Sequence, residues 1–312
     1  MVIIIKKILV IGSLNMDFVI EVNKMPLPGQ TIIGKSFTLV PGGKGANQAY
    51  AIGKLGAEVS ILGAVGNDEY GKKLLQNLNS VNVNVDNVIT ISEDNTGCAF
   101  INVDDNGENN IVVISGANNM ITKETIDNNI ELIKEADIIV VQLEIPLDVV
   151  SYAVKLAKNN NKLVILDPAP AVSNLSDDLL SNVDIIKPNE TEIQILSGIE
   201  INTNEDILKA ARILVDKGVK NVIVSLGGKG SILVTKDNVL SFNAPNVEVV
   251  DTTAAGDSFI AALAKSLLEG KTIIEAIQYA HIVSAMVVTK KGAQTSIPSQ
   301  TEVNEFISNW RG

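Results

Sequence analysis

Short apolar runs alternate with longer amphipathic stretches along nearly the whole chain. The apolar runs, rich in Val, Ile and Leu, predict buried strands at 8–11, 59–64, 138–141, 163–166, 185–186 and 222–225. The amphipathic stretches predict helices at 45–55, 68–79, 122–135, 147–159, 203–217, 255–269, 272–288 and 299–309. Continuous apolar strands separated by helices are typical of a parallel sheet covered on both faces. The pattern therefore predicts a doubly wound, mostly parallel α/β fold.

Two segments break this alternation with a period of two, which is the pattern of half-buried strands. They are 17–40 and 97–115, and the turn-like run 104–109 divides the second into a hairpin. We expect them to form a small antiparallel β lid outside the main sheet. The remaining residues, 1–16, 41–96 and 116–312, would form the α/β domain, with the lid over a site at the strand ends.

Composition and charge narrow the possible functions. The chain has 312 residues, of which 46% are apolar, and a formal net charge of −11 without any basic block. Nucleic acid is therefore not an expected partner, because binding its backbone needs a basic face. The apolar start, 1–10, is too short to span a bilayer and has no signal-peptide cleavage pattern. We expect a cytoplasmic protein that does not enter a membrane.

The run 251–257 carries the strongest local chemistry. It follows a predicted short strand, 247–250, and precedes the helix at 255–269. Its small residues Ala254, Ala255 and Gly256 leave the unpaired N–H groups of a helix start uncovered, where the helix dipole favours a phosphate or an oxyanion. Asp257 lies in the first turn, next to that anion. It could take a proton from a hydroxyl group that attacks phosphorus, or it could merely cap the helix.

Polar residues near the front of the chain suit a sugar. Asn15 and Asp17 follow the first strand two residues apart, and together they could bind adjacent hydroxyl groups. The glycine-rich run 42–45 would let the backbone approach a ligand before a helix that carries Asn47. Taken singly, the first pair could be only a turn, and the second a flexible loop.

Further clusters follow later strands. Glu144 follows the strand at 138–141. Asn189 and Glu192 could form a helix cap or could hold a hydrated Mg²⁺ with phosphate oxygens. The run 225–230 could wrap a nucleotide or form a tight turn. His281, the single histidine, is predicted in mid-helix, where a structural role is the default.

Three motif-based functions are rejected. The run 29–36 matches the P-loop pattern letter for letter, but prolines precede it and no helix follows, so we expect it in the lid. No G-x-G-x-x-G follows the first strand, which argues against a dinucleotide-dependent oxidoreductase. One histidine and one cysteine, Cys98, make a Ser–His–Asp or Cys–His catalytic set improbable and exclude an internal disulfide.

Taken together, these clusters resemble the ribokinase-like carbohydrate kinase family almost from end to end. The strongest matches are 42–49 and 251–257, and 142–144, 188–192 and 291–294 also match at their places. The resemblance implies ATP-dependent phosphorylation of D-ribose at O5, which gives ribose 5-phosphate. It also implies a homodimer paired through the lid.

The resemblance assigns roles by position. The base would be Asp257, and the anion hole would be the amides of Ala254, Ala255, Gly256 and Asp257. The sugar would contact Ser13, Asn15, Asp17, Gly42, Gly43, Lys44, Gly45, Asn47 and Glu144. ATP would contact Asn189, Ser225, Leu226, Gly227, Gly228, Lys229, Gly230, Gly256 and His281, and Glu192 would support Mg²⁺. A potassium ion would lie among Asp251, Thr253, Val287, Lys290, Gly292 and Ser296.

Several alternatives stay open. The enzyme could act on another sugar or nucleoside, such as fructose, deoxyribose or adenosine. A non-catalytic sugar sensor on the same fold is less favoured, because binding a sugar alone requires neither Asp257 nor the Asn189–Glu192 pair. In place of a potassium site, Asp251 could pair with Lys290 or Lys291, or cap a turn.

Overall fold

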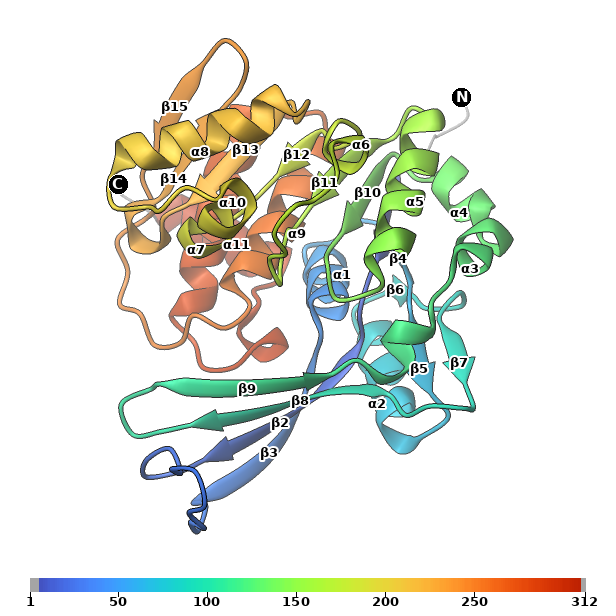
Figure 1. Ribbon diagram of the computed structural model, residues 1–312, viewed down its shortest axis with the longest axis vertical. Helices are drawn as coiled ribbons and strands as arrows, with labels where there is room; N and C mark the ends of the chain where they lie inside the picture. The colour runs from blue at the N-terminus through green and yellow to red at the C-terminus, as the bar shows by residue number, and fades with distance from the viewer. Residues whose placement is uncertain (1–5, 310–312) are drawn as a thin grey trace.

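The main sheet has nine strands. A computed structural model describes residues 6–309; the first five residues of the predicted α/β domain and residues 310–312 lie outside it. The strand order is β15–β14–β13–β12–β11–β10–β1–β4–β6 (Figure 1). The bounds are β1 (Ile8–Ile11), β4 (Val59–Leu62), β6 (Val83–Asn84), β10 (Ile138–Val141), β11 (Leu163–Leu166), β12 (Ile185–Ile186), β13 (Asn221–Ser225), β14 (Ser231–Val234) and β15 (Val239–Phe242). All neighbours pair in parallel except β13–β14 and β14–β15.

Helices cover both faces of this sheet, because successive side chains of each strand point to opposite sides. In β1, Ile8 and Val10 join one apolar core, and Leu9 and Ile11 join the other. The first core lies under α1 (Lys44–Lys54), α2 (Glu69–Asn79), α9 (Ala255–Leu268), α10 (Ile273–Val288) and α11 (Gln300–Asn309). The second lies under α3 (Lys123–Asn128), α4 (Ile130–Glu135), α5 (Leu147–Asn159), α6 (Asp177–Leu180), α7 (Glu190–Ser197) and α8 (Asn204–Asp216). The predicted fold class is confirmed.

Most predicted elements occur where expected, but one predicted helix and one predicted strand are each divided into two elements. The helix at 122–135 is split at Asn129, and the strand at 59–64 ends at Leu62. After Gly63 the chain continues as β5 (Ala64–Gly66), which pairs with β7 (Ile89–Ile91) in a separate sheet. A Cβ at Gly63 would lie 2.7 Å from the Gly12 carbonyl oxygen, so the segments that follow β1 and β4 approach each other closely at this bend.

The predicted strand at 247–250 is wrong. No sheet neighbour pairs with this segment, and the side chains of Val249 and Val250 are exposed. The amides of Val250 and Asp251 donate instead to the Val288 carbonyl at the end of α10, at 2.7 and 3.2 Å. The sheet edge is formed earlier, by the antiparallel hairpin of β14 and β15, which the apolar pattern did not predict.

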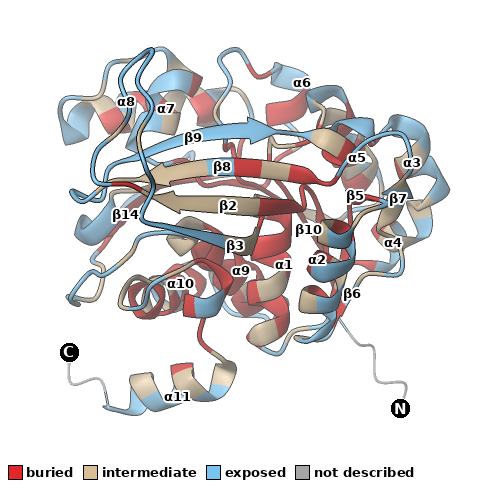
Figure 2. Ribbon diagram, turned by 90° about the horizontal axis from the view of Figure 1, so that it is seen from below, coloured by how far each residue is buried: buried red, intermediate tan, exposed pale blue. Residues whose placement is uncertain are grey.

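The two segments predicted as a lid form a second sheet, which projects from the main body (Figure 1). Its order is β3 (Ser36–Gly42), β2 (Asn15–Glu21), β8 (Gly97–Val103) and β9 (Asn109–Ile114). The pairs β2–β3 and β8–β9 are antiparallel, as expected, and a parallel β2–β8 pairing joins them. Figure 2 shows that β2 changes from buried to intermediate along its length, and that β8 is mostly buried at its start and intermediate or exposed beyond it. The P-loop-like run is a loop that leads into β3.

The strand order reverses at β1, which lies between β10 and β4. In open α/β sheets, the crevice beside such a reversal, at the carboxyl ends of the strands, is where ligands bind. The lid strand β2 follows β1 after three residues, so it begins at this crevice. Among residues 6–309, no helix is long and apolar enough to cross a membrane.

Candidate active site

Asp257 lies in the first turn of α9 and is only 6% exposed. Its carboxylate accepts a hydrogen bond from Asn47 Nδ2 and another from Gln48 Nε2, each at 3.0 Å. It does not cap its own helix, because the N-cap residue is Ala254 and no side chain caps that end. Two side chains of α1 therefore hold the carboxylate in a fixed orientation, as a positioned base requires.

The start of α9 offers free backbone donors. Ala254 has a left-handed conformation, with a φ of 60°, which is uncommon for a residue with a Cβ. The amide of Ala255 donates to the Thr252 carbonyl at 3.2 Å. In the described chain, the amides of Gly256 and Asp257 have no protein acceptor. One of the four amides predicted for the anion hole, that of Ala255, is thus already bonded within the protein.

A buried amide network lies behind Asp257. The fully buried Gln48 donates through the same Nε2 to Asp167 Oδ2 at 2.8 Å, and its Oε1 accepts from Gln142 Nε2 at 2.6 Å. Burial raises the pKa of Asp167, while the nearby charges of Lys44 and Lys187 lower it. No role was predicted for Gln48 or Asp167 from the sequence. The signal was available, since Asp167 directly follows the strand at 163–166.

Three segments meet on the sugar side of the crevice. Glu144, beyond β10, accepts from Ser13 Oγ at 2.5 Å and from the Lys44 amide at 3.0 Å. A Cβ at Gly45 would lie 2.6 Å from the Ser13 amide nitrogen, so α1 can begin this close to β1 only with glycine there. Several carboxylates, Asp257 foremost, raise the pKa of Lys44 although its burial lowers it. The structure thus brings these predicted sugar residues together.

The lid contributes Asn15 and Asp17 from β2. Asn15 is buried, and its Oδ1 accepts from Asn118 Nδ2 at 2.7 Å. Asn118 comes from the 3₁₀ helix η1 (Gly116–Met120), and it was not predicted as a site residue because no motif surrounds it. Asp17 packs against Gly42 of β3, where a Cβ would collide with its carboxylate. Burial, together with the nearby Glu144 and Asp257 charges, raises the pKa of Asp17 to about 7.

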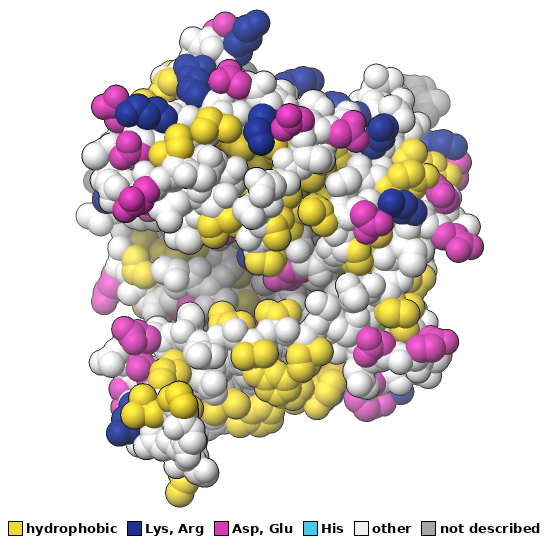
Figure 3. Space-filling model, viewed as in Figure 1, with side chains coloured by type: hydrophobic (Ala, Val, Ile, Leu, Met, Phe, Trp, Pro, Cys, Tyr) yellow, Lys and Arg dark blue, Asp and Glu magenta, His cyan; other side chains and the backbone are white. Residues whose placement is uncertain are grey.

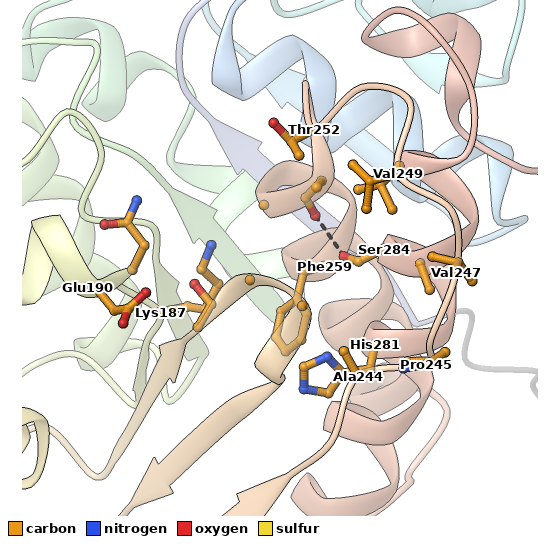
Figure 4. A pocket seen from close by; sticks show the side chains of 18 of the residues that line it. Lys187, Glu190, Ala244, Pro245, Val247, Val249, Thr252, Phe259, His281 and Ser284 are labelled. Carbon is orange, nitrogen blue, oxygen red and sulfur yellow. Dashed lines mark hydrogen bonds between the residues drawn. The ribbon is translucent and has the colours of Figure 1, made fainter. Parts of the chain in front are cut away.

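A cavity of about 540 Å³ lies on the other side of the α9 start. Figure 4 shows Lys187 and Glu190 on one side of it and Val247, Val249 and His281 on the other. His281 Nε2 is 2.8 Å from Ser231 Oγ, and its ring meets Phe259 edge-on. Burial lowers the pKa of His281 to about 4, so the ring is neutral at pH 7. Residues 244–247 and Val249 are part of the wall, so the wall includes two residues of the run 247–250 that was predicted as a strand.

The run 225–230 faces this cavity only in part. Ser225, Gly227 and Gly228 line it. Leu226 packs against the apolar core on one face of the sheet, and Lys229 is exposed. Gly230 is buried with a φ of 101°, and a Cβ there would collide with the Phe242 carbonyl oxygen. Leu226 and Gly230 therefore also serve the β13–β14 connection, where the Leu226 amide donates to the Gly230 carbonyl at 2.8 Å.

Asn189 and Glu192 form the helix cap that was one of their two interpretations. Asn189 Oδ1 accepts from the Glu192 amide, and Glu192 Oε2 accepts from the Asn189 amide, both at 2.8 Å. Asn189 also lines the cavity with Glu190. Within residues 6–309, no group of three or more acidic, histidine or cysteine side chains is arranged to hold a metal ion. Mg²⁺ commonly keeps waters and substrate phosphates as ligands, so one or two carboxylates fit its needs.

Two of the predicted potassium residues, Thr253 and Gly292, bond to a third, Asp251. Asp251 accepts from the Thr253 amide and Oγ1 at 2.9 and 2.6 Å, and from the Gly292 amide at 2.8 Å. Burial raises the pKa of Asp251, but the hydrogen bonds lower it by more, so the net effect is a pKa below the usual value. Lys290 and Lys291 pair with Glu302 and Glu21, so neither pairs with Asp251. The bonds of Asp251 are thus those of a turn cap, and the potassium site stays a prediction. The Val287 carbonyl accepts from the Lys290 amide, and Ser296 Oγ donates to the Ala293 carbonyl.

Residues 5–300 match the model of the pfkB family carbohydrate kinases. The chain belongs to this family. It is 41% identical to a ribokinase of Haemophilus influenzae over 97% of this chain and 99% of that one. It is 39% identical to a deoxyribokinase of Salmonella typhi over 96% and 98% of the two chains. The structure of Arabidopsis thaliana ribokinase complexed with ribose and ATP is 33% identical and covers 98% and 100%, with a TM-score of 0.92. This pfkB-family chain is a carbohydrate kinase.

Proposed function

We propose that this carbohydrate kinase is an ATP-dependent ribokinase, which phosphorylates D-ribose at O5. One observation carries the proposal: the held carboxylate of Asp257 lies between a polar sugar crevice and a nucleotide-sized cavity, beside the free amides of α9. Phosphoryl transfer depends mainly on positioning and charge stabilisation, and this arrangement supplies both.

In the proposed reaction, Asp257 accepts the proton of the O5 hydroxyl as O5 attacks the γ-phosphorus of ATP. The O5–P bond forms, the bond from phosphorus to the bridging oxygen breaks, and ADP leaves. The amides of Gly256 and Asp257 donate to the phosphoryl oxygens, whose charge is spread in the transition state. The bonds from Asn47 and Gln48 keep the carboxylate turned toward the sugar.

The sugar is the finer part of the proposal. Ser13, Asn15, Asp17 and Glu144 present oxygen acceptors around one crevice, which suits a sugar with vicinal hydroxyl groups. A 2-deoxy sugar would leave one acceptor unpaired, at a cost of about 1–3 kcal/mol. A deoxyribokinase shares 39% identity with this chain, so deoxyribose remains the second candidate.

The proposed cofactors are Mg²⁺ with ATP, and K⁺ as an activator. Glu190 lines the cavity, and Glu192 caps α7 beside Asn189, which also lines it; these two carboxylates would hold a hydrated Mg²⁺, which would neutralise phosphate charge when bound. For K⁺, the supporting observation is the position of Asp251, six residues before the base and bonded to the start of the 292–296 turn. Because ATP is a cytoplasmic metabolite, we place the enzyme in the cytoplasm.

We further propose that residues 17–40 and 97–115 act as a lid and as a homodimer contact. Strand β9 is an edge strand whose Ile111, Val112, Val113 and Ile114 are each more than half exposed. Figure 3 shows the apolar surface of the lid beside the hollow that separates it from the main body. An exposed apolar edge strand favours pairing with a second chain. Light scattering should find a dimer, and Val112→Lys should make it a monomer.

One assay tests the main proposal. ADP release from ATP and Mg²⁺ is measured across D-ribose, 2-deoxyribose, fructose and adenosine, with NAD reduction as a control for an oxidoreductase. Ribose should give the highest kcat/KM. A sugar that binds in calorimetry without any ADP release would indicate a sensor, and a higher kcat/KM with another sugar would reassign the substrate.

A further inference from the structure

Lys187 is a buried cation that the assignments above leave without a role. It follows β12, where its amide donates to the Leu166 carbonyl at 3.1 Å, and its side chain is nearly enclosed, with the residue 5% exposed. Lysines are almost never this buried unless they are paired, because an ammonium group out of water is costly. Yet its ammonium group makes no hydrogen bond and no ion pair with any residue in 6–309.

The side chain of Lys187 points at the start of α9. Its Nζ lies 3.0 Å from the position that a Cβ on Gly256 would occupy. The residue also lines the 540 Å³ cavity, and Figure 4 shows its side chain entering that space. The free amides of Gly256 and Asp257 open at the same place. A lysine and a helix N-terminus thus converge on one point, and both favour an anion.

In the described part of the chain, the one carboxylate known to interact with Lys187, that of Asp167, does not pair with it. Asp167 follows the neighbouring strand β11 and feels the charge of Lys187, but the two side chains do not form an ion pair. Asp167 is engaged by Gln48 instead, at 2.8 Å. The ammonium group of Lys187 therefore lies near the carboxylate of Asp167 without pairing with it, and it remains free toward the cavity.

We propose that Lys187 is a catalytic residue that binds the transferred phosphoryl group together with the amides of α9. This inference rests on the kinase function proposed above. As the O5–P bond forms and the bond to the leaving ADP breaks, negative charge stays on the phosphoryl oxygens. Lys187 donates to one of them and keeps its own proton, while Asp257 takes the proton of the sugar hydroxyl. Glycine at 256 leaves the room that this approach needs.

The test compares Lys187→Met with Lys209→Met, a control on an exposed part of α8. The first variant should lower kcat by about 10²–10³, the usual loss on removing one such donor. Its affinity for ADP should change by less than about threefold, since ADP lacks the transferred group. Its affinity for the non-hydrolysable β,γ-imido analogue of ATP should fall by more than that. The control should match the wild type in all three.

Three outcomes would overturn the proposal. The first is a kcat within about threefold of wild type in folded Lys187→Met. The second is an equal loss of affinity for ADP and for the imido analogue, which would show that Lys187 only supports the pocket. If the Lys187→Met variant does not fold, Lys187→Gln takes its place. Either a kcat near that of the wild type or an equal loss of both nucleotide affinities in that variant is the third outcome. If the wild type phosphorylates no sugar, the ribokinase proposal fails separately, and the two nucleotide affinities still decide the role of Lys187.

Discussion

The sugar side and the phosphate side of the site differ in how many of their polar groups already have partners. On the sugar side, Glu144 accepts two hydrogen bonds and Asn15 accepts one, all from protein donors. On the phosphate side, the amides of Gly256 and Asp257 and the ammonium group of Lys187 have none in the described chain. Asp257 lies at the boundary, with its carboxylate held by α1.

This difference indicates what each side contributes. Acceptors that are already oriented lose little entropy when a sugar binds, so the sugar side is preorganised for selectivity. Unpaired buried donors are unfavourable until an anion arrives, so the phosphate side is built for a group that the ligand supplies. Both sides meet at Asp257. Its carboxylate can accept a proton from a hydroxyl group on the sugar side, while the donors on the phosphate side offset the charge of the phosphate.

The boundary itself gives the largest expected effect. Asp257→Asn keeps the shape of the side chain but removes its basicity. We expect kcat to fall by about 10²–10⁴ while KM for ribose changes little. Asp148→Asn, at an exposed site on α5, is the control. Near-normal turnover in the folded Asp257→Asn variant would show that another group takes the proton.

Removing an acceptor from the sugar side should separate the two sides. Asp17→Ala is expected to cost about 2–5 kcal/mol in kcat/KM for ribose, because a sugar hydroxyl loses its partner. KM for ATP should change much less. Steady-state kinetics with each substrate varied in turn measures both. If both substrates suffered equally, Asp17 would have a structural role and the division between the sides would fail.

The raised pKa of Asp17 predicts a pH dependence confined to the sugar side. With a pKa of about 7 in the fold, against 3.8 when unperturbed, Asp17 becomes protonated as the pH falls through 7. A sugar hydroxyl donates to the carboxylate form, so the ribose dissociation constant should rise toward about tenfold per pH unit below 7. Calorimetry with the wild-type protein in the absence of ATP measures this effect without turnover, and Asp17→Asn should abolish it. A dissociation constant that stays flat from pH 5.5 to 8 contradicts the prediction.

The smallest expected effect concerns the ion that would steady the phosphate side. If K⁺ binds beside Asp251, activity should be higher in K⁺ than in Na⁺ at equal ionic strength, and Asp251→Ala should lose that preference. Ionic strength must be matched because screening alone changes charged binding. Equal rates in both salts would leave Asp251 as the turn cap that its bonds to Thr253 and Gly292 describe.

The sequence predicted the regular part of this molecule well, for a physical reason. Buried parallel strands and their covering helices depend on local periodicity, which the chain shows directly. The failures come from long-range contacts. Residues 247–250 have a strand-like composition, but the adjoining amides of Val250 and Asp251 bond to the end of α10. The same holds for three residues that were not predicted. Gln48 and Asn118 bond to partners more than 60 residues away in the chain, and Lys187 lines a cavity, so no local sequence pattern indicates their contacts.

The motifs that did locate the site combine a special backbone with a chemical group. Gly43 has a φ of 86° and, with Gly45, lets α1 approach β1, while Asn47 and Gln48 follow in the same helix. The sequence therefore predicted that this segment and Asp257 belong to one site, although it did not predict which atoms hold the carboxylate. In the run 225–230, Ser225, Gly227 and Gly228 line the cavity, while Leu226 packs against the apolar core and Gly230 lies against the Phe242 carbonyl; its contact with ATP stays a prediction.

The most direct test of the account is the position of the phosphate in the product. The protein is incubated with D-ribose, ATP and Mg²⁺, and the product is examined by ³¹P and ¹³C NMR. The account predicts one phosphomonoester whose phosphorus couples to C5 of ribose, with an equal amount of ADP. Phosphate attached at another carbon would contradict the assignment of Asp257 as the base for O5. Release of inorganic phosphate without a sugar ester would contradict the kinase mechanism itself.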